Sequence, residues 1–168
     1  MRLSTFIVPV ASILSLACAQ VHLIRNALDE IKTKVDATEH AFNTHNGKSI
    51  KSSLNALDKS ISEATVVVSN SNSLSTREAI SLRSSFAGLQ ASIDNAFPVV
   101  KSVEPVLDSL DLSGAIKDSI VKQRLAVGTL GNFVVAKMPV FIRGAANGFV
   151  VTLDRSYLGV IEVYSERC

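Results

Sequence analysis

Residues 21–42, VHLIRNALDEIKTKVDATEHAF, repeat apolar side chains at alternating steps of three and four. This spacing places the apolar side chains on one stripe of an α-helix and the charged side chains on its other faces. The polar run at 43–47, NTHNG, is typical of a turn and ends the predicted helix. The stripe consists of Val21, Ile24, Leu28, Ile31, Val35 and Phe42, with Thr38 filling the gap.

The same period continues along the rest of the chain, and four further stripes predict four further helices. Ser75 and Glu78 have the spacing of a capping box in front of the third helix. Asp111 or Ser113 is expected to cap the fourth helix, and Pro139 is expected to end it. The stripes are Ile50, Leu54, Leu57, Ile61, Ala64 and Val68; Ala79, Leu82, Phe86, Leu89, Ile93 and Phe97; Ile116, Ile120, Val127, Leu130 and Val134; and Ile142, Ala146, Phe149, Leu153, Val160 and Tyr164.

The segment 98–111 is the least regular part of the pattern. Pro98 and Pro105 are expected to break or kink the chain, with a short helical turn between them. Three glycines in the last helix, Gly144, Gly148 and Gly159, would allow a neighbouring helix to approach closely. The sequence therefore predicts an all-α fold, an up-and-down bundle of about five helices joined by short loops.

The first 19 residues have the pattern of a cleavable signal peptide. A basic start at Arg2 precedes an apolar run over residues 3–16, and small residues occupy positions 17 and 19. We expect cleavage before Gln20, a single helical-bundle domain over residues 20–168, and a secreted, extracellular or cell-wall location. An N-terminal membrane anchor and a lipid-modified Cys18 are the alternatives. No later run is long and apolar enough to predict a transmembrane segment.

Cleavage would leave Cys168 as the one cysteine, which links two chains, forms a mixed disulfide with a small thiol, or stays unpaired. Lys and Arg form no basic stripe, so nucleic-acid binding is not expected. Catalytic motifs are missing, and Asp36 with His40 supplies at most two metal ligands. We therefore expect no catalytic residues, no metal site, no cofactor and no enzymatic activity. The Ser-rich linker, with Ser69, Ser71, Ser73, Ser75 and Thr76, offers acceptors for O-linked sugars.

The chain resembles the secreted fungal hydrophobic surface-binding protein A (HsbA) family, also called cell-wall galactomannoproteins. The resemblance spans roughly residues 20–165 and includes the first helix, Leu74-Ser75 and Tyr164. Residues 101–110, KSVEPVLDSL, look like the family segment Lys-x-x-x-Pro-x-Phe-Asp-x-Leu, with Leu107 in place of the common Phe. The resemblance implies adsorption to hydrophobic surfaces, attachment to the cell wall, and, in some members, capture of fatty acids inside the bundle.

Two functions follow as hypotheses. The first is a secreted, non-enzymatic protein that binds hydrophobic surfaces or fatty-acid-like lipids. The alternative is a structural or interaction mannoprotein of the cell wall without a small-molecule ligand, for which cell-wall polysaccharide is a partner. A helical inhibitor resembling the plant invertase and pectin methylesterase inhibitors is disfavoured, because those bundles carry paired cysteines and the mature chain would have none. Inward positions expected to contact a lipid are Phe86, Leu89, Ile93, Phe97, Ile120, Val127, Leu130, Val134, Phe149 and Leu153.

Overall fold

The computed structural model describes residues 11–165, with side-chain environments from residue 19 onward. Within these residues the chain forms helices joined by short turns, and no strand. Residues 1–10, at the start of the predicted signal peptide, and Cys168 lie outside the described part. The helices are α1 (Ala11–Asn43), α2 (Gly47–Ser69), α3 (Thr76–Ser81), α4 (Arg83–Ser102), α5 (Glu104–Ser109), α6 (Ser113–Lys137) and α7 (Val140–Val163).

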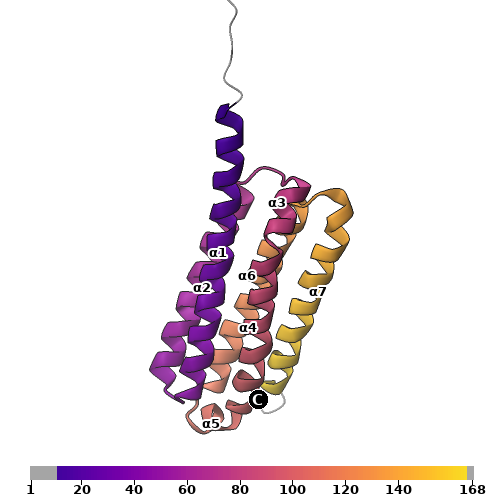
Figure 1. Cartoon of the computed structure of the whole chain (residues 1–168). Helices are drawn as coiled ribbons and strands as arrows, with labels where there is room; N and C mark the ends of the chain where they lie inside the picture. The colour runs from indigo at the N-terminus through magenta and orange to yellow at the C-terminus, as the bar shows by residue number, and fades with distance from the viewer. Residues whose placement is uncertain (1–10, 166–168) are drawn as a thin grey trace, which may run out of the picture.

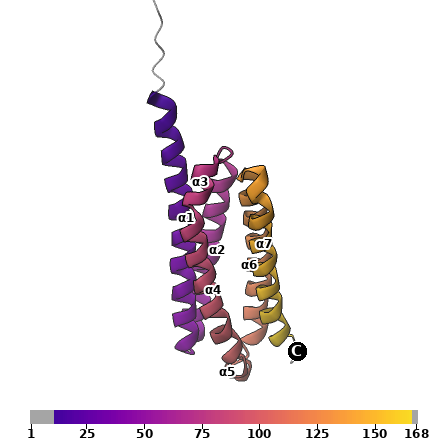
Figure 2. The same ribbon diagram turned by 45° about the vertical axis from the view of Figure 1, so that its right-hand side comes forward.

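The five long helices, α1, α2, α4, α6 and α7, alternate in direction, which confirms the predicted up-and-down bundle (Figure 1). Neighbours around the bundle follow the order α1, α2, α6, α7, α4 and back to α1. The contact between α4 and α7 is much the sparsest in this ring. Turning the molecule shows the α6–α7 pair standing opposite α1, α2 and α4 (Figure 2). We call the end of the bundle where α3 lies the α3 end; it is uppermost in Figure 1.

The apolar stripes of the sequence form the core. Every apolar member of the α1 and α2 stripes is buried, and so is Thr38, whose hydroxyl donates to the Lys34 carbonyl at 2.8 Å. The predicted capping box is confirmed: the Ser75 amide donates to the Glu78 carboxylate at 2.7 Å, and the Ser75 side chain accepts from the Glu78 amide. For α1 and α2, the period of the apolar residues was thus sufficient to predict which face of the helix is buried.

The predicted third helix is divided at Leu82 into α3 and α4. The Leu82 amide bonds three residues back, to Ala79, instead of four. Arg25 of α1 donates through Nη2 to the Ser81 carbonyl at 3.0 Å. This long-range bond satisfies a carbonyl at the end of α3, so the division is stabilised by tertiary structure.

A break or a kink was expected at Pro98, and the break is wrong, because α4 continues through this residue to Ser102. Proline removes one helical hydrogen bond, to the carbonyl of Asp94, and both residues are exposed, so water can satisfy that carbonyl. The short helix also does not lie between the prolines. It is α5, and Pro105 occupies its first turn, where the missing amide hydrogen costs no intrahelical bond.

The predicted cap of the fourth helix is also wrong. Leu112 is the N-cap of α6, without a side-chain cap bond, and Ser113 is buried inside the first turn. Asp111 instead adopts φ 57°, a left-handed conformation that Asp tolerates and that reverses the chain after α5. Pro139 does separate α6 from α7, as predicted.

The Ser-rich linker is held against the end of α6. The Lys137 ammonium donates to the Ser69 carbonyl at 2.9 Å and to the Ser71 carbonyl, and the Leu74 amide donates to the Lys137 carbonyl at 2.8 Å. Ser71 is buried, and its hydroxyl donates to Val68. Ser71 is therefore a poor acceptor for a sugar.

Candidate ligand-binding site

A cavity of about 420 Å³ lies on the axis of the bundle, in the half nearer the α3 end. It receives side chains from α1, α2, α3, α4, α6 and α7. This volume lies within the range of about 300–1,000 Å³ that is usual for small-molecule sites. The apolar stripes therefore enclose a space at this level of the bundle instead of filling it.

Eight of the ten positions expected to face a lipid line this cavity: Phe86, Leu89, Ile93, Val127, Leu130, Val134, Phe149 and Leu153. The other two, Phe97 and Ile120, line a second cavity of about 30 Å³ instead. Val35, Leu57, Ile93 and Tyr157 border both cavities. These four residues form the partition between the two spaces, and we call them the floor of the large cavity.

Sequence reasoning omitted several lining residues. The omitted apolar ones include Leu28, Ile31, Val35, Leu57 and Ile61, which belong to the stripes of the first two helices, so the same periodicity would have found them. Tyr157 also lies on the last stripe, four residues after Leu153 and three before Val160, whereas Arg83 carried no such signal. They are the two cavity-lining residues with a charged or hydrogen-bonding side chain, and all the others are aliphatic, aromatic, Met or Gly. The wall thus favours an apolar ligand with few polar groups.

The cavity opens between α3–α4 and the start of α7. Three of its lining residues, Ile80, Arg83 and Ala145, are exposed and mark the mouth. Phe86 and Phe149 are half-buried just inside and bridge α4 and α7 with an edge-to-face contact, their ring centroids 5.6 Å apart. The sparse packing between α4 and α7 places the mouth on this side of the bundle.

Tyr157 closes the opposite end. It is buried, and its ring packs edge to face on Phe97 with centroids 4.9 Å apart. Burial raises the pKa of the Tyr157 phenol above its ordinary value, and the negative charge of Asp58 raises it further. The Tyr157 phenol therefore stays neutral, and the charge of Asp58 disfavours a further negative charge beside it.

The close approach of α6 and α7 depends on a glycine that sequence analysis did not single out. A Cβ atom added at Gly131 would lie 2.7 Å from Cγ2 and 2.9 Å from Cγ1 of Val150. The expectation for Gly144 and Gly148 is wrong, since nothing lies within 4 Å of a Cβ at either position, and Gly159 faces only the flexible Lys101 side chain. Gly131 thus shapes one wall of the cavity.

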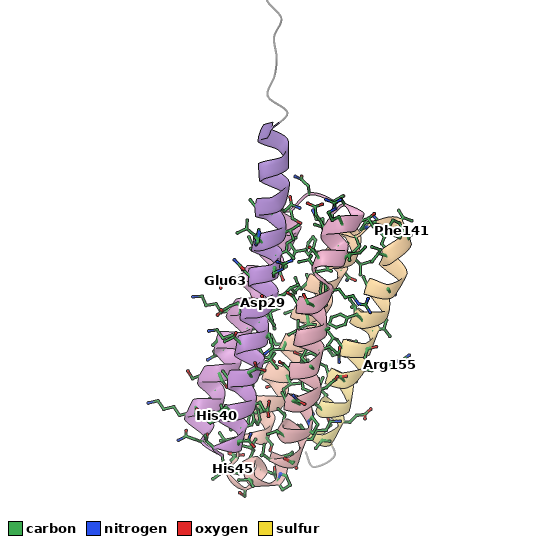
Figure 3. All side chains as sticks on the ribbon, in the orientation of Figure 1. Asp29, His40, His45, Glu63, Phe141 and Arg155 are labelled. Atoms are coloured by element: carbon green, nitrogen blue, oxygen red, sulfur yellow. The ribbon has the colours of Figure 1, made fainter. Side chains whose placement is uncertain are left out.

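Asp36 and His40, the pair weighed in the sequence as metal ligands, do not line the large cavity. Asp36 pairs with Lys32 at 2.6 Å; although burial raises the pKa of Asp36, its hydrogen bonds with Lys32 and Ser92 lower it below the ordinary value. His40 and His45 lie at the end of the bundle opposite Phe141 (Figure 3). In the described part of the chain, no three His, Cys, Asp or Glu residues are grouped to hold a metal ion.

The fold and the cavity define a helical bundle that encloses an apolar chamber. Residues 21–136 match the sequence profile of the family described as hydrophobic surface binding protein A. The chain belongs to this family, and the resemblance seen in the sequence is confirmed. No curated protein sequence matches the chain significantly. Among residues 11–165, no helix combines the length and apolar character needed to cross a membrane.

Solved structures with the same fold include two ligand-binding domains of the Penicillium marneffei MP1 protein. Domain 1, complexed with arachidonic acids, shares 18% identity with a TM-score of 0.84, over 87% of this chain and 99% of that chain. Domain 2, complexed with multiple arachidonic acids, shares 16% identity with a TM-score of 0.83, over 86% and 96%. AFMP4P, complexed with palmitic acid, shares 17% identity with a TM-score of 0.82, over 86% and 99%.

Proposed function

We propose that this protein is a secreted, non-enzymatic carrier that binds a single-chain lipid, such as a fatty acid, in its large cavity. The observation that carries the proposal is the almost wholly apolar wall around about 420 Å³. Structures of the same fold were solved with arachidonic and palmitic acids, which supports this ligand class.

The energetics of burial agree with the proposal. Each buried methylene contributes about 0.8 kcal/mol, so a 16-carbon chain gains about 12 kcal/mol gross. Association costs about 4–15 kcal/mol before any net affinity remains. An acyl chain can therefore bind without specialised polar chemistry.

Secretion and attachment to the fungal cell wall form part of the proposal, in keeping with the family. The predicted cleavage site before Gln20 falls within α1, whose first turns project beyond the other helices (Figure 1). The side-chain amide of Gln20 donates to the Asn72 carbonyl at 3.0 Å and accepts from the Asn72 backbone N–H at 3.1 Å. A mature chain starting at Gln20 would thus keep its first residue anchored. The N-terminus of the secreted protein, determined by mass spectrometry, tests this boundary.

The ligand is tested by filling the cavity. Ala146→Phe adds a ring at a half-buried lining position, and Ala91→Phe makes the same change at an exposed position of α4 outside the lining. We expect wild type and Ala91→Phe to bind a fluorescent 16-carbon fatty acid, and Ala146→Phe to lose most of this affinity while remaining folded. Lipid extraction and mass spectrometry of the secreted protein would identify its natural ligand. Absence of fatty-acid binding by wild-type protein would refute the proposal and favour a mannoprotein without a small-molecule ligand.

A further inference from the structure

The two polar side chains of the cavity wall lie at opposite ends. Arg83 is exposed at the mouth, and Tyr157 is buried at the floor. The other arginines described near the α3 end include Arg25 and Arg143, whose guanidinium groups donate to backbone carbonyls. Within residues 19–165, no hydrogen bond or ion pair engages the Arg83 guanidinium. Arg83 is therefore an available cation at the entrance of an apolar chamber.

At the floor, the charge that acts on the Tyr157 phenol is negative. Asp58 lies close enough for its charge to act on the Tyr157 phenol. One carboxylate oxygen of Asp58 accepts from Lys122 at 2.8 Å, while the other is buried with no hydrogen-bond partner. A ligand carboxylate placed at the floor would lose its hydration and meet this negative charge, so both effects oppose it.

We propose that Arg83 binds the carboxylate of the lipid at the mouth, and that the acyl chain runs inward with its methyl end at Tyr157. This orientation rests on the function proposed above. A guanidinium matches the geometry of a carboxylate and can donate two parallel hydrogen bonds. Arg83 thus makes the protein selective for free fatty acids over uncharged lipids of the same chain length.

The size of the effect follows from the position of Arg83. Exposed ion pairs stabilise weakly, whereas hydrogen bonds to charged groups in less exposed sites are stronger. Between these limits, we expect wild-type protein to bind palmitic acid about 3- to 10-fold more tightly than 1-hexadecanol. Most of the total affinity comes from the acyl chain, so Arg83 controls selectivity more than overall binding.

Selectivity is tested with three variants at neutral pH. Arg83→Gln should weaken binding of palmitic acid to the level of the alcohol and leave binding of the alcohol unchanged. Arg83→Lys should retain part of the preference, and Arg77→Gln, an exposed charge change on α3 outside the lining, should retain all of it. Equal losses for acid and alcohol in Arg83→Gln, or no loss for either, overturn the assignment but leave the carrier function intact. Failure of wild type to bind either lipid defeats both.

The orientation is tested independently at the floor. Ile93→Ala removes part of the partition towards the smaller cavity, where the methyl end would lie. Each extra methylene that finds room should raise affinity about fourfold, so the variant should shift its preference from 16-carbon towards 20-carbon saturated acids. Ile80→Ala at the mouth should leave this ratio unchanged. If Ile93→Ala does not fold, Ile93→Val provides the same test, and an unchanged ratio in a folded variant refutes the inward direction of the chain.

Discussion

Replacing Gly131 with Ala tests the helix contact that forms one wall of the cavity. The added Cβ would lie 2.7 and 2.9 Å from the two terminal carbons of Val150, closer than carbon atoms normally approach. Val is stiff about χ1, so it cannot simply rotate away. Either Val150 moves into the cavity or α7 moves away from α6.

The magnitude follows from comparison with Gly128, one turn earlier on α6, where nothing lies within 4 Å of an added Cβ. Both Ala variants gain about 0.5–1 kcal/mol from removing a helical glycine. Only Gly131→Ala incurs the overpacking cost, about 1–3 kcal/mol. The helical gain cancels in the comparison, so Gly131→Ala should be less stable than Gly128→Ala by about 1–3 kcal/mol.

Equilibrium urea unfolding, followed by circular dichroism, measures this difference. Gly128→Ala should exceed wild type in stability, and Gly131→Ala should bind a fluorescent fatty acid more weakly because its wall is displaced. Adding Val150→Ala to Gly131→Ala removes the clash, so the two changes should be non-additive in a double-mutant cycle. The reasoning is refuted if the two Ala variants are equally stable, or if the cycle shows no coupling.

Three further changes probe the rest of the bundle. Burial raises the pKa of the Tyr164 phenol above its ordinary value of 10.0, and the charge of Glu104 raises it further. As the pH rises, the phenol therefore loses its proton in the unfolded chain before it does so in the folded chain. The free energy of unfolding should fall as the pH rises above about 10, and it should fall less steeply in Tyr164→Phe. An equally steep fall in urea unfolding near about pH 11 would contradict this. Ser75→Ala should cost about 1 kcal/mol through loss of the capping box, whereas Ser73→Ala, at an exposed loop position, should be near neutral in the same assay. Lys137→Met should lower the free energy of unfolding by about 1.5–3 kcal/mol and speed amide hydrogen exchange in the linker, because the Lys137 ammonium donates to the Ser69 and Ser71 carbonyls. Unchanged exchange would show that this contact does not hold the linker.

The helices were predictable because burial follows the helical period. Each apolar residue of the first two stripes, from Val21 to Val68, proved to be buried. The failures occurred where distant contacts or solvent decide. The division at Leu82 is supported by Arg25, 56 residues from its partner Ser81. The helix passes Pro98 at a point where Asp94 and Pro98 are both exposed, so that water can satisfy the freed carbonyl. Neither condition can be read from local spacing.

The apolar part of the site was more predictable from the sequence than its polar part. Leu89, Ile93 and Leu130 were expected to face inward because they lie on stripes, and they line the cavity. Arg83 lies between the stripe residues Leu82 and Phe86, where a charge is usually interpreted as solvated. Arg83 lies at the rim of the cavity, on the side where α4 and α7 pack sparsely. A polar residue at the edge of a stripe therefore needs the packing of the next helix before its role can be inferred.

The cavity itself follows from helix number and side-chain size together. A periodic stripe shows which side chains face the axis, but not how far away the axis lies. A ring of five helices leaves more central space than a compact four-helix bundle, and large inward side chains would be needed to fill it. This chain has 5% aromatic residues and no Trp, and two of its phenylalanines, Phe86 and Phe149, pair near the mouth instead of filling the centre. Aliphatic residues and Gly131 make up most of the remaining wall. Taken alone, stripes of aliphatic residues look like an ordinary helical core. Because few bulky side chains point towards the axis of this five-helix ring, the chamber stays unfilled.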